Sequence, residues 1–96
     1  MLHLIVSQPL PTRPSEAAGN RKRYWQWIQP LIDGGEVRSV YGRVGRGAVA
    51  ILDVASNERL HELLNQWCDI VPAEFQVFPL LDPEAMQAFL ERQGEA

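Results

Sequence analysis

The chain has 96 residues, 46% hydrophobic and 22% charged, with a formal net charge of −3. This length suits one domain, residues 1–96, and is too short for two. The negative charge argues against a general attraction to nucleic acid or anionic lipid. No apolar run approaches the roughly 20 residues that a membrane span needs. The lone cysteine excludes an internal disulfide, which is typical of a reducing environment, so we predict a soluble, cytoplasmic protein.

The N-terminal third predicts a strand, a proline-rich connection and a helix. Residues 2–6 are aliphatic and β-branched, which favours a strand, and the absence of a basic leader argues against a signal peptide. The proline cluster that follows excludes helix and central strand. Ser15 is expected to cap a helix that reaches Ile28 or Ile32, and Pro30 is expected to kink or end it.

The middle of the sequence predicts a β-hairpin. Residues 37–43 alternate, which places Val37, Ser39 and Tyr41 on one face of a strand and Arg38, Val40 and Gly42 on the other. Three glycines between positions 42 and 47 predict a turn; a phosphate loop would precede a helix and carry a lysine. Residues 48–54 are almost continuously apolar, which is typical of a strand buried on both faces.

The C-terminal half predicts a helix, a strand and a final helix. Ser56 is expected to cap the first of these helices. Residues 75–80 follow a proline and favour a strand. Asp82 and Pro83 are a strong helix start. The apolar stripes of the two helices are Leu60, Leu63, Leu64 and Trp67 in the first, and Met86, Phe89 and Leu90 in the second.

This order of elements predicts the α+β class: a ferredoxin-like βαββαβ sandwich with an extra C-terminal helix. Its helices cover only one face of the sheet. Because residues 48–54 are apolar on both sides, we expect a second copy to cover the other face, forming a dimeric α+β barrel. The final helix is expected to provide a second contact, so the predicted partner is the chain itself, as a homodimer or higher oligomer.

Three residues are candidates for acid–base chemistry. His61 lies one step off an apolar helical stripe and is either a general acid or base or an ordinary boundary histidine. Arg38 has the donor geometry to hold a substrate carboxylate, and Tyr41 has a hydroxyl that can donate to a carbonyl. The alternatives are a surface arginine paired with Glu36 or Glu74, and a core tyrosine.

Aromatic and basic residues crowd the first helix. Trp25 and Trp27 are about 200° apart on a helical wheel, so one must leave the apolar stripe and line a cleft or contact a partner. Residues 21–23 are Arg-Lys-Arg, and together with Arg43 and Arg46 they suggest an anion site. A solvated helix face is the simpler interpretation.

The other reactive side chains suggest structural roles. His3 is expected to point to the face opposite Leu2 and Leu4, as an ordinary strand or interface histidine. Cys68 has no second cysteine near it and is expected to be a buried structural thiol. With two distant histidines and one cysteine, we predict no metal site, and we predict no cofactor.

Two segments resemble the muconolactone isomerase family. Gly35–Tyr41 is similar to that family's run of glycine, arginine and an aromatic residue, and Leu52–Leu64 resembles its strand end followed by a helix that opens on serine and carries leucine-histidine. The resemblance implies a ferredoxin-like fold, dimer-based assembly, a lactone-carboxylate substrate and a cofactor-free proton shift. It carries over to Arg38, Tyr41 and His61. Residues 21–28 depart from the family's acid- and lysine-rich helix.

Two hypotheses follow for function. The first is a cofactor-independent isomerase in which His61 moves a proton and Arg38 holds a carboxylate of a small-molecule substrate. The second is a non-catalytic small-molecule-binding or assembly module of the same fold. It is favoured by the first helix, whose residues 21–28 differ from those of the family. A nucleic-acid binder, based on Arg21–Arg23, has the least support because the net charge is negative.

Overall fold

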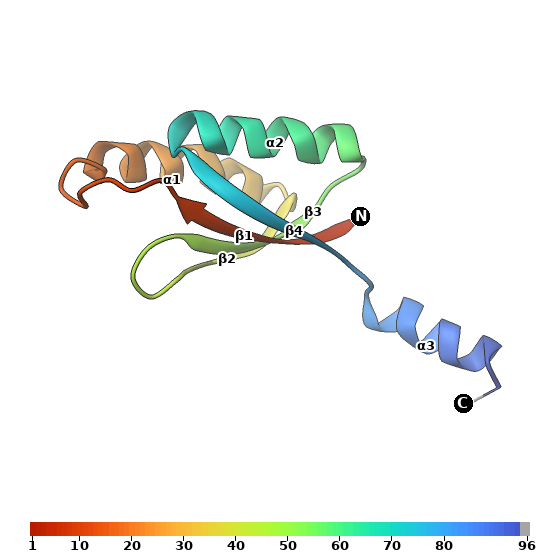
Figure 1. Cartoon of the computed structure of the whole chain (residues 1–96). Helices are drawn as coiled ribbons and strands as arrows, with labels where there is room; N and C mark the ends of the chain where they lie inside the picture. The colour runs from red at the N-terminus through yellow and green to blue at the C-terminus, as the bar shows by residue number, and fades with distance from the viewer. Residues whose placement is uncertain (95–96) are drawn as a thin grey trace.

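The computed structural model describes residues 1–94 and confirms the ferredoxin-like order of elements. Four strands form one sheet in the order β2-β3-β1-β4, and Figure 1 shows α1 and α2 together on one side of it. The elements are β1 (Leu2–Pro9), α1 (Ala18–Asp33), β2 (Val37–Gly42), β3 (Ala48–Asp53), α2 (Asn57–Ile70), β4 (Ala73–Leu80) and α3 (Pro83–Arg92).

The core lies between the sheet and the two helices. Ile5 in the central strand β1 pairs with Ala50 of β3 and Val77 of β4, so these three residues point to the same face. The apolar stripe of α2 closes over this face, as its 3.6-residue period predicted. The buried core is made of Ile5, Tyr24, Ile28, Val37, Ala50, Leu52, Val54, Leu60, Leu63 and Trp67.

The start of α1 differs from the prediction, whereas its end at Asp33 lies next to the predicted Ile32. Ser15 does not cap the helix; Ala17 takes that position and makes no side-chain cap. The reason is a preceding turn in which the Ala17 amide already donates to the carbonyls of Arg13 and Pro14. Pro30 does not end the helix, because the lost bond falls in the last turn and the Pro30 carbonyl still accepts from the Gly34 amide at 2.9 Å.

The predicted alternation of β2 is wrong after its first residue. Val37 pairs with Leu52, but the next partner of β3 is Ser39, so Arg38 is an extra residue in a β-bulge. The bulge moves Val40 onto the same face as Val37, where both pack against the core. Ser39 and Tyr41 therefore point to the opposite face.

Both predicted caps in the C-terminal half are present. The Ser56 hydroxyl accepts from the Arg59 amide at 3.1 Å at the start of α2. The Asp82 carboxylate accepts from the Ala85 amide at 2.8 Å, with Pro83 in the first turn of α3. Each cap satisfies a backbone donor that the helix leaves free, which sets the two helix starts.

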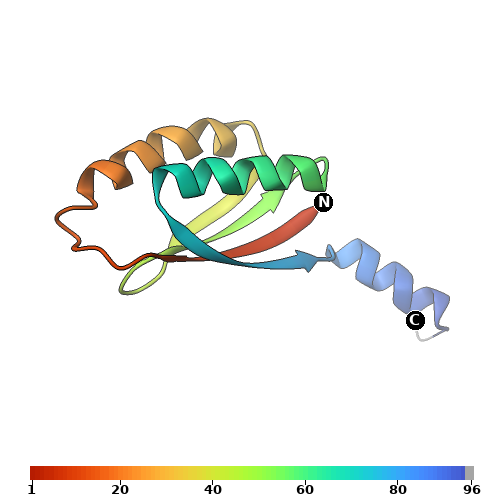
Figure 2. The same cartoon turned by 45° about the horizontal axis from the view of Figure 1, so that its top comes forward.

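The other face of the sheet, called the open face below, is apolar and has no helix over it. Besides Tyr41, strand register places seven wholly apolar side chains on it: Leu2, Leu4, Val6, Val49, Ile51, Phe78 and Leu80. Helix α3 continues beyond the end of β4, away from α1 and α2 (Figures 1 and 2). None of its residues is buried, and Met86, Phe89 and Leu90 are all about half exposed.

Candidate functional site

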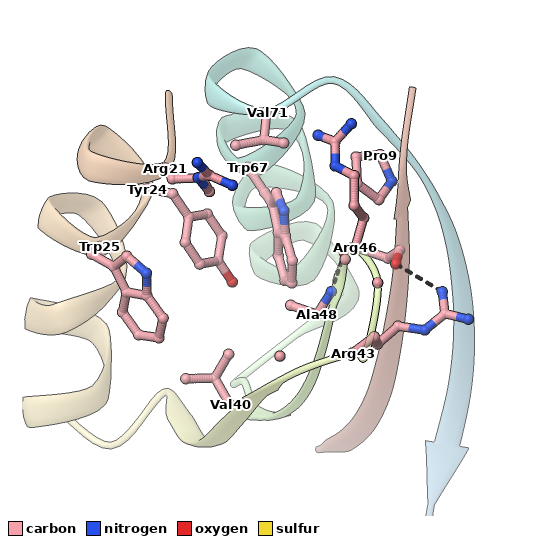
Figure 3. A pocket seen from close by; sticks show the side chains of 14 residues that line it. Pro9, Arg21, Tyr24, Trp25, Val40, Arg43, Arg46, Ala48, Trp67 and Val71 are labelled. Atoms are coloured by element: carbon pink, nitrogen blue, oxygen red, sulfur yellow. Dashed lines mark hydrogen bonds between the residues drawn. The ribbon is translucent and has the colours of Figure 1, made fainter. Parts of the chain in front are cut away.

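A cavity of about 270 Å³, called the hairpin cavity below, lies between α1, the end of α2 and the β2–β3 hairpin. Figure 3 shows that its wall combines aromatic rings from the helices with two arginines from the hairpin. The residues that define it are Ser7, Arg21, Tyr24, Trp25, Val40, Arg43, Arg46, Gly47, Ala48 and Trp67.

Tyr24 lines this wall and has a buried hydroxyl. The residue is 7% exposed, and its hydroxyl oxygen has no hydrogen-bond partner within residues 1–94. In Figure 3 the hydroxyl points towards the space between Trp25, Val40 and Ala48. An unsatisfied buried hydroxyl costs about 1–3 kcal/mol of folding free energy, so a hydrogen bond to a polar partner would stabilise the protein.

The aromatic wall is continuous from α1 to β4. The centroid of the Tyr24 ring lies 5.7 Å from that of Trp25, in an edge-on contact, and 5.1 Å from that of Trp67. Trp67 in turn contacts Phe75 at 5.2 Å. The predicted departure of one tryptophan from the apolar stripe is thus accounted for: Trp25 is 49% exposed and lines the cavity, whereas the Trp27 indole donates to Gln66 at 2.8 Å.

Three arginines surround the cavity and donate to neutral acceptors. Arg21 donates to the Pro14 carbonyl at 3.2 Å, and Arg43 donates to the Ser7 carbonyl at 3.1 Å. Arg46 donates to both the carbonyl and the hydroxyl of Thr12. The ion pairs found within residues 1–94 involve other cations. Within residues 1–94, these three guanidiniums therefore carry charges that no ion pair compensates.

Gly47 holds the hairpin close to β1. Its φ is +103°, and a Cβ at this position would overlap the Ser7 carbonyl oxygen. The close approach lets the Ala48 amide donate to the Ser7 hydroxyl at 3.0 Å. The predicted turn is thereby confirmed, and it brings Arg43 and Arg46 to the mouth of the cavity.

The cavity is suited to binding and to hydrogen-bond donation. Burial raises the pKa of the Tyr24 hydroxyl, so it stays protonated and acts as a donor. Of the described residues that line the cavity, none is a histidine, a carboxylate or a thiol. The arrangement can hold a flat ring against aromatic rings and offer several donors to an oxyanion.

His61 lies away from this cavity. It is on the exposed side of α2 and is absent from the cavity lining. Its Nε2 atom is 3.3 Å from the amide nitrogen of Asn65, one helical turn further on. The structure therefore places His61 in a solvent-exposed position, and its predicted catalytic role remains a prediction.

Arg38 and Tyr41 lie on β2, also outside the cavity. The Arg38 guanidinium donates to Asp53 at 2.7 Å, so its partner is neither Glu36 nor Glu74. Tyr41 is 71% exposed on the open face and is not a core residue. Within one copy of the chain, the structure does not bring either residue together with His61. Their predicted roles likewise remain predictions.

The remaining candidates have structural surroundings. His3 is 7% exposed on the helix-covered face, opposite Leu2 and Leu4 as predicted, and its Nδ1 atom has no partner within residues 1–94. The Cys68 thiol is partly buried and lies 3.6 Å from the Ala73 carbonyl.

Two further findings concern metal ions and membranes. Within the described part of the chain, no three histidine, cysteine or acidic side chains gather to hold a metal ion. No helix in residues 1–94 is long and apolar enough to cross a membrane.

Sequence reasoning missed the cavity as a site, although it identified several of its parts. The basic run at 21–23, with Arg43 and Arg46, indicates either an anion site or a solvated helix face. Residues 21–23 are all exposed, and Arg21, Arg43 and Arg46 also line one cavity. The usable signal was the combination of hairpin arginines with an aromatic pair, Tyr24 and Trp25, beside the basic run on α1.

Comparison with solved structures supports the fold. The structure of 5-chloro-2-hydroxyhydroquinone dehydrochlorinase from Burkholderia phenoliruptrix AC1100, in complex with 2,5-dihydroxybenzoquinone, is similar with a TM-score of 0.71 and 15% sequence identity. The match covers 88% of this chain and 98% of the other. At this identity it supports the fold class, ferredoxin-like as in dimeric α+β barrels, and not the activity.

Comparison at the level of sequence gives a family. No curated protein sequence matches this chain, and the resemblance to muconolactone isomerases remains a prediction. A family model described as a domain of unknown function (DUF3303) matches residues 1–94. Because this match spans nearly the whole chain, the protein belongs to the DUF3303 family.

Proposed function

We propose that this protein binds a small, ring-containing anion in the hairpin cavity. The observation that carries the proposal is the buried Tyr24 hydroxyl, which has no partner within residues 1–94, in a lining with three arginines that form no ion pair within the same residues. A ligand oxygen would satisfy the hydroxyl, and its charge would be attracted by the arginines. Trp25 and Trp67 would contact the ring.

The similar dehydrochlorinase gives this proposal a suitable probe. Its structure contains 2,5-dihydroxybenzoquinone, a ring whose oxygen substituents match the donors of the hairpin cavity in kind. Because the two chains are only 15% identical, the likeness guides the choice of compound and does not establish the ligand.

Replacing Tyr24 by phenylalanine tests the proposal with two effects of opposite sign. Y24F removes an unsatisfied buried hydroxyl, so the empty protein should be more stable by about 1 kcal/mol. The same change should weaken binding of two probes about tenfold, because one hydrogen bond is lost. The probes are 2,5-dihydroxybenzoquinone and phenylacetate, a ring that carries a carboxylate. Urea unfolding measures the first effect, and isothermal titration calorimetry measures the second.

Lys22→Ala is the matched control, since Lys22 is an exposed cation of α1 that does not line the cavity. It should leave affinity for both probes within about twofold of the wild-type value. Equal affinities of Y24F and the wild-type protein for both probes would contradict the proposal.

Cofactor-free acid–base catalysis is the second candidate, and the enzymatic name of the similar solved structure favours it. In this proposal His61 shifts a proton on a lactone-carboxylate substrate held by Arg38, with Tyr41 as a donor. The hairpin cavity itself offers Tyr24 as a donor and no base. We therefore place binding before isomerisation.

A turnover assay with muconolactone and related enol-lactones separates the two candidates. Isomerisation that falls at least about a hundredfold in His61→Gln, an effect typical of losing a general acid or base, would support catalysis. Asp69→Asn, two helical turns further along the exposed side of α2, is the matched control. Binding of phenylacetate without any turnover would support the non-catalytic module.

We also propose that a second copy of the chain covers the open face. Seven apolar side chains share one sheet face that no helix covers within residues 1–94 (Figure 1), and an uncovered apolar face is typical of an interaction surface. Helix α3 follows the end of β4 and presents Met86, Phe89 and Leu90, each about half exposed. A two-fold pair would cover both surfaces at once.

A further inference from the structure

A second cavity of about 260 Å³, called the proline cavity below, adjoins the hairpin cavity. It lies between the proline segment 9–12, the start of α1 and the connection from α2 to β4. The Leu10 amide donates to the Pro72 carbonyl at 3.0 Å and so fixes the proline segment to that connection. Its lining is mostly apolar: Leu10, Pro11, Ala17, Val71 and Pro72, with Thr12 and Asn20 as polar neighbours.

Arg21 and Arg46 line both cavities and are the two charged residues that the linings share. One nitrogen of each guanidinium already donates a hydrogen bond to the backbone. Arg21 Nη2 donates to the Pro14 carbonyl, and Arg46 Nη1 donates to the Thr12 carbonyl. A guanidinium has five N–H donors in a fixed plane, so each arginine keeps further donors for a ligand. These tethers position the two cations before any ligand arrives, which lowers the entropic cost of binding.

Size also argues that the two cavities act together. Binding sites for small molecules usually measure about 300–1,000 Å³, and each cavity alone, at about 270 and 260 Å³, is slightly smaller. Their shared lining residues, Pro9, Arg21, Arg46 and Val71, make them adjacent compartments of one site.

We infer that the ligand has three parts: a ring in the hairpin cavity, an oxyanion at Arg21 and Arg46, and a short uncharged apolar substituent in the proline cavity. The inference rests on the proposed function and names its ligand class. The chemistry of each lining supports the order of the parts. Aromatic rings line the first compartment, two cations belong to both linings, and proline, leucine and valine side chains line the second.

Two carboxylates test the third part. Phenylacetate has the ring and the acid, and 2-phenylhexanoate adds a butyl chain on the carbon that carries the acid. The wild-type protein should bind at least one enantiomer of 2-phenylhexanoate about tenfold more tightly than phenylacetate, because the butyl chain buries several methylenes. Isothermal titration calorimetry on the full chain measures both affinities.

Asn20→Phe fills the proline cavity from α1 without touching the hairpin cavity, because Asn20 lines only the former. This variant should reduce the gain from the butyl chain to less than about twofold and keep the wild-type affinity for phenylacetate. Lys22→Phe adds the same ring two residues away, outside both linings, and should keep the full gain. Asn20→Leu provides a smaller filling residue if N20F lowers the melting temperature.

The outcomes distinguish this inference from the proposed function. Equal affinity of the wild-type protein for the two carboxylates, or a gain that persists in N20F, would overturn the inference alone. Failure of the wild-type protein to bind 2,5-dihydroxybenzoquinone and both carboxylates would overturn the proposed function as well. A gain that is lost in N20F and kept in K22F supports both.

Discussion

Both faces of the sheet carry apolar side chains, but the two faces differ in how far these side chains are covered within one chain. On the helix-covered face, Ile5 and Ala50 are 0% and 1% exposed, whereas Phe78 and Leu80 on the open face are 45% and 37% exposed. Strand alternation alone predicts apolar residues on both faces but cannot say what covers each one. The difference teaches that helix packing covers one face, whereas no helix within residues 1–94 covers the other (Figure 1), where we propose that a second copy packs.

The largest contrast is expected from truncating one large aromatic on each face. Trp67→Ala removes the side chain that contacts both Tyr24 and Phe75, and it should lower the free energy of unfolding by about 3–5 kcal/mol. Phe78→Ala, measured on dilute monomer, should cost less than about 1 kcal/mol because its site is half exposed. Urea unfolding of both variants checks this. Similar costs would mean that the two faces are equally important for monomer stability.

The next effect concerns self-association through the open face. Phe78→Glu would place an unpaired charge in the proposed interface and should weaken self-association at least about a hundredfold, since one uncompensated buried charge costs about 3–5 kcal/mol. Val44→Glu, at the fully exposed hairpin tip, is the control and should associate like the wild-type protein. Sedimentation velocity over a concentration series measures both, and a wild-type chain that stays monomeric would refute the pairing.

A smaller effect separates α3 from the rest of that interface. Phe89→Ala should weaken self-association about tenfold, as expected for truncating an interface aromatic. Because none of the residues of α3 is buried in its own chain, unfolding of the dilute monomer should not change. Gln87→Ala, a polar position on the same helix, is the control. A loss of monomer stability in Phe89→Ala would instead indicate that α3 packs against its own sheet.

The smallest effect is a dependence of stability on acid. Hydrogen bonds from Arg59 lower the pKa of Glu36 below its usual value, so the folded state binds a proton less readily than the unfolded chain does. This stability is present above the unfolded-state pKa of about 4.3 and is lost as the pH falls through the lower folded-state value. Urea unfolding between pH 3 and pH 6 should therefore show a shallower acid loss in Glu36→Gln than in the wild-type protein.

The sequence predicted the elements well because most of the signals are local. The stripe of α2, its Ser56 cap and the Asp82 cap of α3 are each readable within one or two turns. The bulge at Arg38 was missed because an extra residue in one strand is detectable only against its partner, here the pairing of Val37 with Leu52. The missed register also misplaced Val40.

The cavity was harder to predict because its parts come from distant segments. Ser7, Tyr24 and Arg43 belong to three elements that meet only after the hairpin folds against β1. Residue types alone cannot reveal that Arg43 and Arg46 lack a carboxylate partner, since twelve acidic residues are present in the chain. The family resemblance emphasised His61 and Arg38 instead, and these lie away from the cavity.

The close contact of Gly47 with the Ser7 carbonyl has a practical consequence for labelling experiments. Position 47 accepts no side chain without pushing the hairpin away from β1, whereas Val44, three residues earlier in the same turn, is fully exposed. The hairpin is therefore held against β1 at Gly47, whereas the exposed position 44 tolerates substitution. A fluorophore attached at position 44, with Cys68 replaced by alanine, would stand near the cavity mouth and follow ligand occupancy without altering any residue that lines the cavity.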